Sequence, residues 1–189
     1  MAGRDKKSLP IREVLAQRPI VVRRAPGRPH EALLFLGGHV CRAALGRSGL
    51  AALKREGDGA TPIGRFCMRQ VLYRADRGVR PRTLLPLRAI RSDDGWSEDP
   101  SDPNYNRLVK LSPRNTSDRL TRQDHLYDLI IVLGYNDVPR VRGRGSAIFV
   151  HLAREGYTPT AGCIGLSRHD LLQVIAHMKR GMKLMVTRQ

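Results

Sequence analysis

The chain has 189 residues with a formal net charge of +17, from 34 Lys and Arg against 17 Asp and Glu. This length suits one domain with at most a short arm, and it buries enough surface to fold without disulfides or metal ions. Its 41% apolar and 27% charged residues exclude a disordered, collagen-like or cysteine-scaffold chain, and its apolar runs of about five residues are too short to cross a membrane.

The chain begins with a charged stretch that has no apolar core of a secretory signal. We interpret residues 1–30 as a basic N-terminal arm and residues 31–189 as a single domain. The sequence leaves open whether the protein stays in the cytoplasm, leaves by another route, or starts after a removed signal.

Alternating or β-branched runs between Gly and Pro turns dominate the rest of the chain and predict strands. In chain order the expected strands are 19–24, 32–36, 39–45, 64–73, 126–133, 146–152 and 181–186. Helices are fewer, with weak candidates at 11–17 and 49–55. A stronger one covers 170–179, because Ser167 can cap it with Asp170 three positions on. The pattern predicts a mostly β fold, a sandwich or partly open barrel with one helix near its end.

Residues 74–124 show little periodicity and are rich in Arg, Asp and Pro. We expect a long insertion loop, and its Trp96 and Tyr105 favour an ordered, packed one. The acidic residues of this loop do not have the spacing of a calcium-binding loop. We therefore expect no metal ion there.

Three cysteines occur in the chain, Cys41, Cys67 and Cys163. Their odd number and wide spacing fit neither a disulfide framework nor a C-x-x-C metal site. Cys41 alternates with Ala43 and Leu45, which is typical of a small core residue. No residue pattern indicates a cofactor.

Cys163 stands in a different context. An expected strand ends at His151, and the loop after it ends in Thr160-Ala161-Gly162-Cys163. A reactive thiol needs a base, which His151 can provide, and such pairing predicts a lowered thiol pKa. Gly162 permits a sharp turn whose backbone N–H groups can hold an oxyanion. By spacing alone, such a pair is more often two core or rim residues than a catalytic pair.

This segment resembles the L,D-transpeptidase catalytic domain of the YkuD type, whose motif is a His on a strand followed by Ser/Thr-His-Gly-Cys. A second motif of that family is similar to the segment at the start of an expected strand, Thr61-Pro62-Ile63-Gly64-Arg65-Phe66. The resemblance covers about residues 35 to 187. Ala161 stands where the family motif has the His of Ser/Thr-His-Gly-Cys. Gly165 stands where the family often has an Arg or Asn after the apolar residue that follows the Cys. Arg154 and Arg168 flank the loop and are candidates for the missing cation.

The resemblance implies a β-sandwich or open barrel, with the C-terminal helix packed after a catalytic Cys163. It implies a peptidoglycan transferase that joins stem peptides through a cysteine acyl-enzyme, in 3-3 or in 1-3 linkage between L-Ala and meso-diaminopimelate. His151 would be base then acid, and the Gly162 and Cys163 backbone would contribute to the oxyanion site. The candidate residues for contacting the substrate are Thr160, Ala161, Arg154, Arg168, Tyr135, Asn136 and Trp96.

The resemblance also implies a place in the cell envelope, a role in cell-wall biogenesis and shape, and a cysteine that carbapenems acylate. We expect a monomer that needs no cofactor or metal and has no membrane span. If water were the acceptor, the same site would make an L,D-carboxypeptidase or amidase.

An Arg-rich protein that binds nucleic acid is a further alternative, motivated by the charge alone. Arg binds phosphates and carboxylates in paired hydrogen bonds, so its 28 copies favour some polyanion. They are spread along the chain, however, and aromatic residues are only 5% of it, which leaves few stacking platforms for single strands. These observations weaken the nucleic-acid alternative, and the resemblance implies peptidoglycan stem peptides as the partner.

Overall fold

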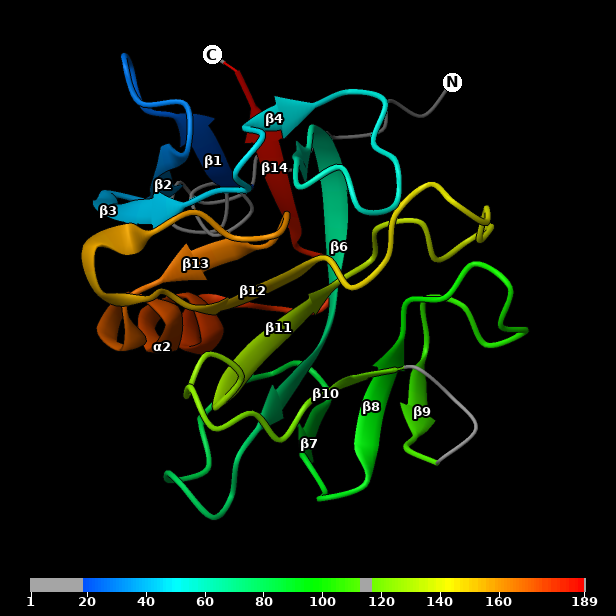
Figure 1. Cartoon of the computed structure of the whole chain (residues 1–189). Helices are drawn as coiled ribbons and strands as arrows, with labels where there is room; N and C mark the ends of the chain where they lie inside the picture. Colours follow the sequence, from blue (N-terminus) through cyan, green and yellow to red (C-terminus); the bar gives the residue numbers. More distant parts are fainter. Residues whose placement is uncertain (1–18, 113–116, 189) are drawn as a thin grey trace, which may run out of the picture.

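The structure is a computed structural model that describes residues 19–112 and 117–188. The helix expected at 11–17 lies outside the described residues. Within them the chain is mostly β with one α-helix, so the expected fold class is confirmed (Figure 1). None of the described helices has the length and apolarity to span a membrane.

The strands form three sheets, of nine, three and two strands. Their bounds are β1 Ile20–Arg24, β2 Glu31–Leu36, β3 His39–Ala44, β4 Leu50–Ala51, β5 Thr61–Pro62, β6 Gly64–Tyr73, β7 Leu87–Ala89, β8 Asp94–Ser97, β9 Leu108–Lys110, β10 Ser117–Arg119, β11 Leu129–Leu133, β12 Phe149–Leu152, β13 Ile164–Leu166 and β14 Lys183–Thr187. Residues 20–24, expected in the arm, pair with both β2 and β14 and belong to the main sheet.

The main sheet closes on itself. Its order is β11-β12-β13-β3-β2-β1-β14-β6-β7, and β11 also pairs with β6. Strand β6 serves both neighbours because it has 10 residues: 64–67 pair with β14, and 68–73 pair with β11. The described strands therefore form a ring, with β7 attached outside it.

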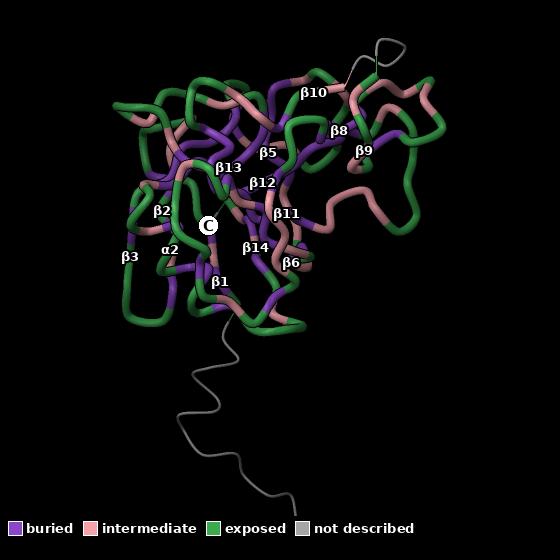
Figure 2. Tube along the Cα trace, turned by 90° about the horizontal axis from the view of Figure 1, so that it is seen from below, coloured by how far each residue is buried: buried purple, intermediate pink, exposed green. Residues whose placement is uncertain are grey.

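Alternation along the strands produces two apolar clusters, one on each side of β11 and β12. Leu129, Ile131 and Leu133 face the larger cluster, whereas Ile130 and Val132 face the smaller one. Figure 2 shows the long buried stretches of the chain in these strands, with exposed loops around them.

The helix α2, Arg168–His177, packs against the larger cluster through buried Leu171, Val174 and Ile175. Ser167 Oγ accepts a hydrogen bond from the Asp170 backbone N–H at 3.1 Å. The helix therefore starts directly after its cap, two residues before the expected start. It follows β13 and Cys163 in the chain, as the sequence predicts.

Two expected segments differ from the structure. Residues 49–55 form no helix, because Gly49 adopts φ 72° and Leu50–Ala51 pair with Thr61–Pro62 instead. The expected loop at 74–124 contains a small antiparallel sheet, β10-β8-β9, with Trp96 on its central strand. The smaller cluster lies between this sheet and β11–β12.

Candidate active site

Cys163 lies directly before β13, in the smaller apolar cluster, and is only 8% exposed. Its thiol donates to the Ala147 carbonyl oxygen at 3.1 Å and accepts from the Phe149 backbone N–H at 3.4 Å. Ala147 has φ 51°, a conformation that L-residues rarely adopt. The loop before β12 thus bends sharply where it meets the sulfur.

His151 is on the same face of β12 as Phe149, because side chains alternate along a strand. Its Nδ1 lies 2.8 Å from the Leu152 carbonyl oxygen, which can only accept, so Nδ1 carries the proton. Burial lowers the pKa of His151 to about 4. The imidazole is therefore neutral at pH 7, with a lone pair on Nε2.

The thiol is also neutral in the free protein. Burial, supported by the carboxylates of Glu98 and Asp118, raises the pKa of Cys163 to about 12. The Phe149 N–H and the Lys54 ammonium act in the opposite direction and are outweighed. The lowered thiol pKa expected from pairing with His151 is therefore wrong for this state.

The turn before Cys163 is held by hydroxyl groups. Thr160 Oγ1 donates to the Cys163 carbonyl at 2.7 Å and accepts from the Gly162 N–H at 3.1 Å. Thr61 Oγ1 lies 3.5 Å from the same carbonyl. Gly162 has φ 140°, and a Cβ there would lie 2.8 Å from the Ala60 carbonyl oxygen. Only glycine fits this turn without a shift of the backbone.

Asn106, between β8 and β9, ties β8 to both ends of the connection between β11 and β12. Its Oδ1 accepts from the Trp96 indole N–H at 3.0 Å and from the Ala147 N–H at 3.1 Å. Its Nδ2 donates to the carbonyls of Tyr135 and Asn136, both at 2.9 Å. Since Ala147 holds the thiol, Asn106 positions the backbone on which the thiol rests.

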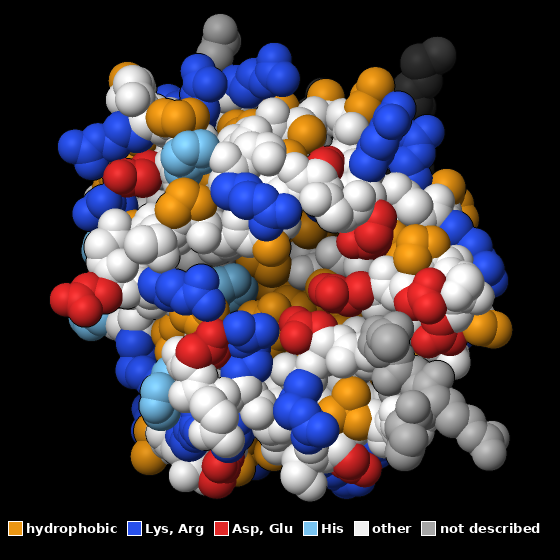
Figure 3. Space-filling model, in the orientation of Figure 1, with side chains coloured by type: hydrophobic (Ala, Val, Ile, Leu, Met, Phe, Trp, Pro, Cys, Tyr) orange, Lys and Arg blue, Asp and Glu red, His pale blue; other side chains and the backbone are white. Residues whose placement is uncertain are grey.

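Cys163 and His151 line one pocket of about 250 Å³. The other lining residues are Arg47, Arg122, Leu126, Tyr127, Arg154, Thr158, Pro159, Thr160 and Ala161. Figure 3 shows a hollow on this face, with an apolar floor, Lys and Arg along one side and Asp and Glu along the other.

The three arginines of the pocket differ in their partners. Arg122 holds Asp124 through two hydrogen bonds, of 2.9 and 2.6 Å, and its guanidinium lies 5.0 Å from the centre of the Tyr127 ring. Arg154 contacts the same carboxylate at 3.2 Å. Arg47 forms no ion pair within residues 19–112 and 117–188, so its charge is available to an anion.

The candidate residues from the sequence divide into two groups. Thr160, Ala161 and Arg154 line the pocket with Cys163 and His151. The others do not line it: Arg168 pairs with Asp128 at 3.2 Å near a different pocket, and Tyr135, Asn136 and Trp96 serve as scaffold around Asn106.

Sequence reasoning missed Arg47, Arg122 and Asn106. Arg47 lies on the turn that joins β3 to β4, and Gly46 beside it forms an isolated bridge with Thr160. No spacing signal points to it, because it is more than a hundred positions before the cysteine loop. Asn106 carried one signal, its place in the turn-rich segment that holds the only Trp.

The L,D-transpeptidase catalytic domain model, YkuD, matches residues 29–186. Among solved structures, the chain is similar to L,D-transpeptidase 3 from Mycobacterium tuberculosis, at 16% identity and a TM-score of 0.41. The match covers 90% of this chain and 61% of that one, and a TM-score this low adds nothing to the assignment. No curated protein sequence matches the chain. Because the family model spans most of its length, this chain belongs to the L,D-transpeptidase catalytic domain family.

Proposed function

We propose that the chain is a peptidoglycan L,D-transpeptidase whose nucleophile is Cys163 and whose general base is His151. The observation that carries this proposal is the shared pocket, in which a thiol and a neutral imidazole lie within the matched family domain. The free imidazole nitrogen is Nε2, the tautomer that a general base needs.

The proposed reaction begins from two neutral groups. When a donor stem enters, the thiol proton moves to His151 Nε2, and Sγ attacks the carbonyl carbon of the donor amide. The tetrahedral intermediate collapses, the carbon–nitrogen bond breaks, and Nε2–H protonates the leaving amine. An acceptor amine then gives a proton to Nε2 and attacks the thioester, which releases the thiolate to be reprotonated.

The oxyanion that forms in the first step needs a hydrogen-bond donor. The Gly162 N–H already donates to the Thr160 hydroxyl. We therefore assign the Cys163 N–H to the oxyanion and give Gly162 and Thr160 the task of holding the turn. The sequence predicts that the Gly162 N–H binds the oxyanion, whereas we now propose that Gly162 only sets the conformation of the turn.

Charge on the two sides of the hollow supports transfer between stems. Arg47 and Arg154 suit the carboxylates of a donor stem, because guanidinium groups bind carboxylates in pairs of hydrogen bonds. The acidic side suits the ammonium group of an acceptor (Figure 3). A nucleic-acid backbone offers no cation for that side. We propose that the protein acts as a monomer at the cell envelope, as the resemblance implies.

Incubation with purified stem-peptide fragments, followed by mass spectrometry, tests the proposal. We expect crosslinked dimers with the natural protein and none with Cys163→Ala. Their fragmentation distinguishes 3-3 from 1-3 links, and shortened monomers without dimers would assign hydrolysis instead. A Cys163→Ala protein that matches the natural one would refute a catalytic role for this thiol.

Carbapenem labelling isolates the nucleophile from the acceptor. We expect an adduct on the intact natural protein, because the drug acylates the cysteine of this family. The adduct should be absent from Cys163→Ala and present in Cys67→Ala, which keeps the pocket.

A further inference from the structure

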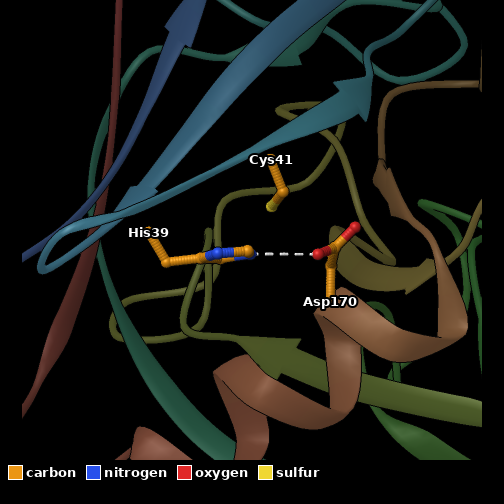
Figure 4. Close-up of side chains that lie close together, drawn as sticks. All are labelled: His39, Cys41 and Asp170. Carbon is orange, nitrogen blue, oxygen red and sulfur yellow. Dashed lines mark hydrogen bonds and ion pairs between the residues drawn. The ribbon is translucent and has the colours of Figure 1, made fainter.

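Three side chains with metal-binding atoms lie together where β3 meets α2, away from the pocket (Figure 4). They are His39 and Cys41 from the strand and Asp170 from the helix. His39 Nε2 is 3.1 Å from Asp170 Oδ1, and the ligand atoms of all three lie within 4.8 Å of one another. In this view the imidazole points toward the carboxylate, and the sulfur points toward the imidazole.

The fold explains this juxtaposition. His39 and Cys41 are two positions apart on β3, so they share one face. Asp170 stands in the first turn of α2, where its Oδ2 accepts from the Ser167 hydroxyl at 2.5 Å. That bond orients the carboxylate and leaves Oδ1 directed at His39. Since β13 joins β3 to the start of α2, both sides of the cluster are held by the main sheet.

We propose that His39, Cys41 and Asp170 bind a zinc ion. Nitrogen, sulfur and oxygen donors together suit a borderline divalent ion such as Zn²⁺, whereas Mg²⁺ and Ca²⁺ select oxygen alone. No sequence motif indicates this site, because His39 and Asp170 are 131 positions apart in the chain.

The distances are close to those of such a site. Tetrahedral zinc, with bonds of about 2.0 to 2.3 Å, spaces its ligand atoms about 3.3 to 3.7 Å apart. His39 Nε2 and Asp170 Oδ1, now 3.1 Å apart, would have to separate by a few tenths of an ångström to take this spacing. The His39 side chain is 47% exposed, so its ring can adjust, and solvent can reach the remaining position of the ion. On binding, the Cys41 thiol becomes a thiolate and its proton goes to the buffer.

The ion would clamp β3 to α2. Cys41 belongs to the larger apolar cluster and Cys163 to the smaller one, so the two thiols serve different sites. Zinc that binds only the folded chain stabilises it by mass action. The expected role is structural, and it does not depend on the proposed reaction.

The test uses the full chain with Cys163→Ala, which removes the pocket thiol. After incubation with zinc chloride and dialysis against metal-free buffer, we expect one bound zinc per chain by elemental mass spectrometry, and a raised Tm. His39→Gln keeps a hydrogen-bond donor toward Asp170 but loses the imidazole, so zinc affinity should fall more than about tenfold. His169→Gln, next to Asp170 but outside the cluster, is the matched control and should retain the metal.

Cobalt(II) provides a second readout. A sulfur-to-cobalt charge-transfer band in the near ultraviolet should appear, disappear with Cys41→Ser and persist with Cys67→Ser. The proposal is overturned if no zinc remains after dialysis, or if His39→Gln binds as much zinc as His169→Gln. The His39 comparison decides the question even if Cys41→Ser does not fold, because His39 is a surface side chain.

Discussion

The Cys163 thiol donates its hydrogen to the carbonyl oxygen of Ala147, 3.1 Å away, and not to His151. The thiol thus rests on a backbone acceptor while the imidazole, held through Nδ1, keeps its lone pair free. Both groups stay uncharged until a substrate brings them into use. An uncharged pair resists oxidation and alkylation better than a thiolate does.

This resting state predicts slow alkylation of Cys163 at neutral pH. Burial raises the pKa of Cys163 to about 12. The rate of its reaction with iodoacetamide should therefore still increase with pH above about 8.5, the pKa of free cysteine. Peptide mapping at each pH separates Cys163 from Cys41 and Cys67. A rate midpoint below that of free cysteine would contradict the neutral thiol.

His151 should make stability depend on pH. Its pKa is lowered from 6.5 to about 4 on folding, so between these values the unfolded chain binds a proton that the folded chain does not. The contribution of His151 is complete above pH 6.5 and is lost as pH falls toward 4. At about 1.4 kcal/mol per pKa unit, the loss is on the order of 3 kcal/mol.

Urea unfolding of the natural protein and His151→Gln, across that range, measures this contribution. The unfolding free energy of the natural protein, relative to that of His151→Gln, should increase as pH rises from 4 and should be constant above pH 6.5. A difference that does not change with pH would show that His151 keeps its ordinary pKa.

Gly162→Ala should disrupt the turn. A Cβ at Gly162 would lie 2.8 Å from the Ala60 carbonyl oxygen, and φ 140° is strained for alanine. Gly156→Ala is the matched control, because Gly156 has φ 71° in the same connection but nothing within 4 Å. We expect a cost of about 1 kcal/mol for the control and at least twice that for Gly162→Ala. Transferase activity should fall more than tenfold only in the latter, and equal effects of the two variants would remove the steric argument.

Asn106→Ala should lower both stability and activity. The side chain is buried and makes four hydrogen bonds, and its loss leaves buried N–H and C=O groups without partners. We expect at least ~3 kcal/mol of lost stability in chemical unfolding, at about 1 to 3 kcal/mol for each unsatisfied group. The emission of Trp96 should also shift, because its indole loses its acceptor. Asn104→Ala, two positions away and exposed, should do neither, and a silent Asn106→Ala would refute the positioning role.

Arg47→Ala tests substrate contact. Arg47 lines the pocket without a carboxylate partner among the described residues, so its removal should raise KM for stem peptides severalfold while kcat changes little. Arg168→Ala is the comparison, since that residue pairs with Asp128 outside the pocket. If Arg168→Ala raised KM and Arg47→Ala did not, the assignment of the anion contact would be reversed.

Strands with a clear apolar or alternating run were predictable from sequence. β2, β3 and β6 lie within a residue of their expected bounds, because each is an apolar or alternating run bounded by Gly or Pro turns. The motif residues His151 and Cys163 were also found, and the structure brings them to one pocket.

Other features depend on contacts that no local pattern encodes. β8, β9 and β10 have three or four residues each, too few for a periodic signal, and they form only by pairing with one another. The ion pair of Arg168 with Asp128, and the lack of a carboxylate partner for Arg47 among the described residues, depend on how distant segments fold together. The thiol pKa is set by burial, which spacing to a histidine does not reveal.

Strand β6 bridges two halves of the ring, and that has a consequence for the order of folding. β1 pairs with β14, which lies at the other end of the described chain, and β14 in turn holds the first half of β6. Contacts between such distant segments form slowly, because long loops must close before the contacts stabilise anything. The ring therefore stays open until β14 has been synthesised, which follows the synthesis of every residue that lines the cysteine pocket.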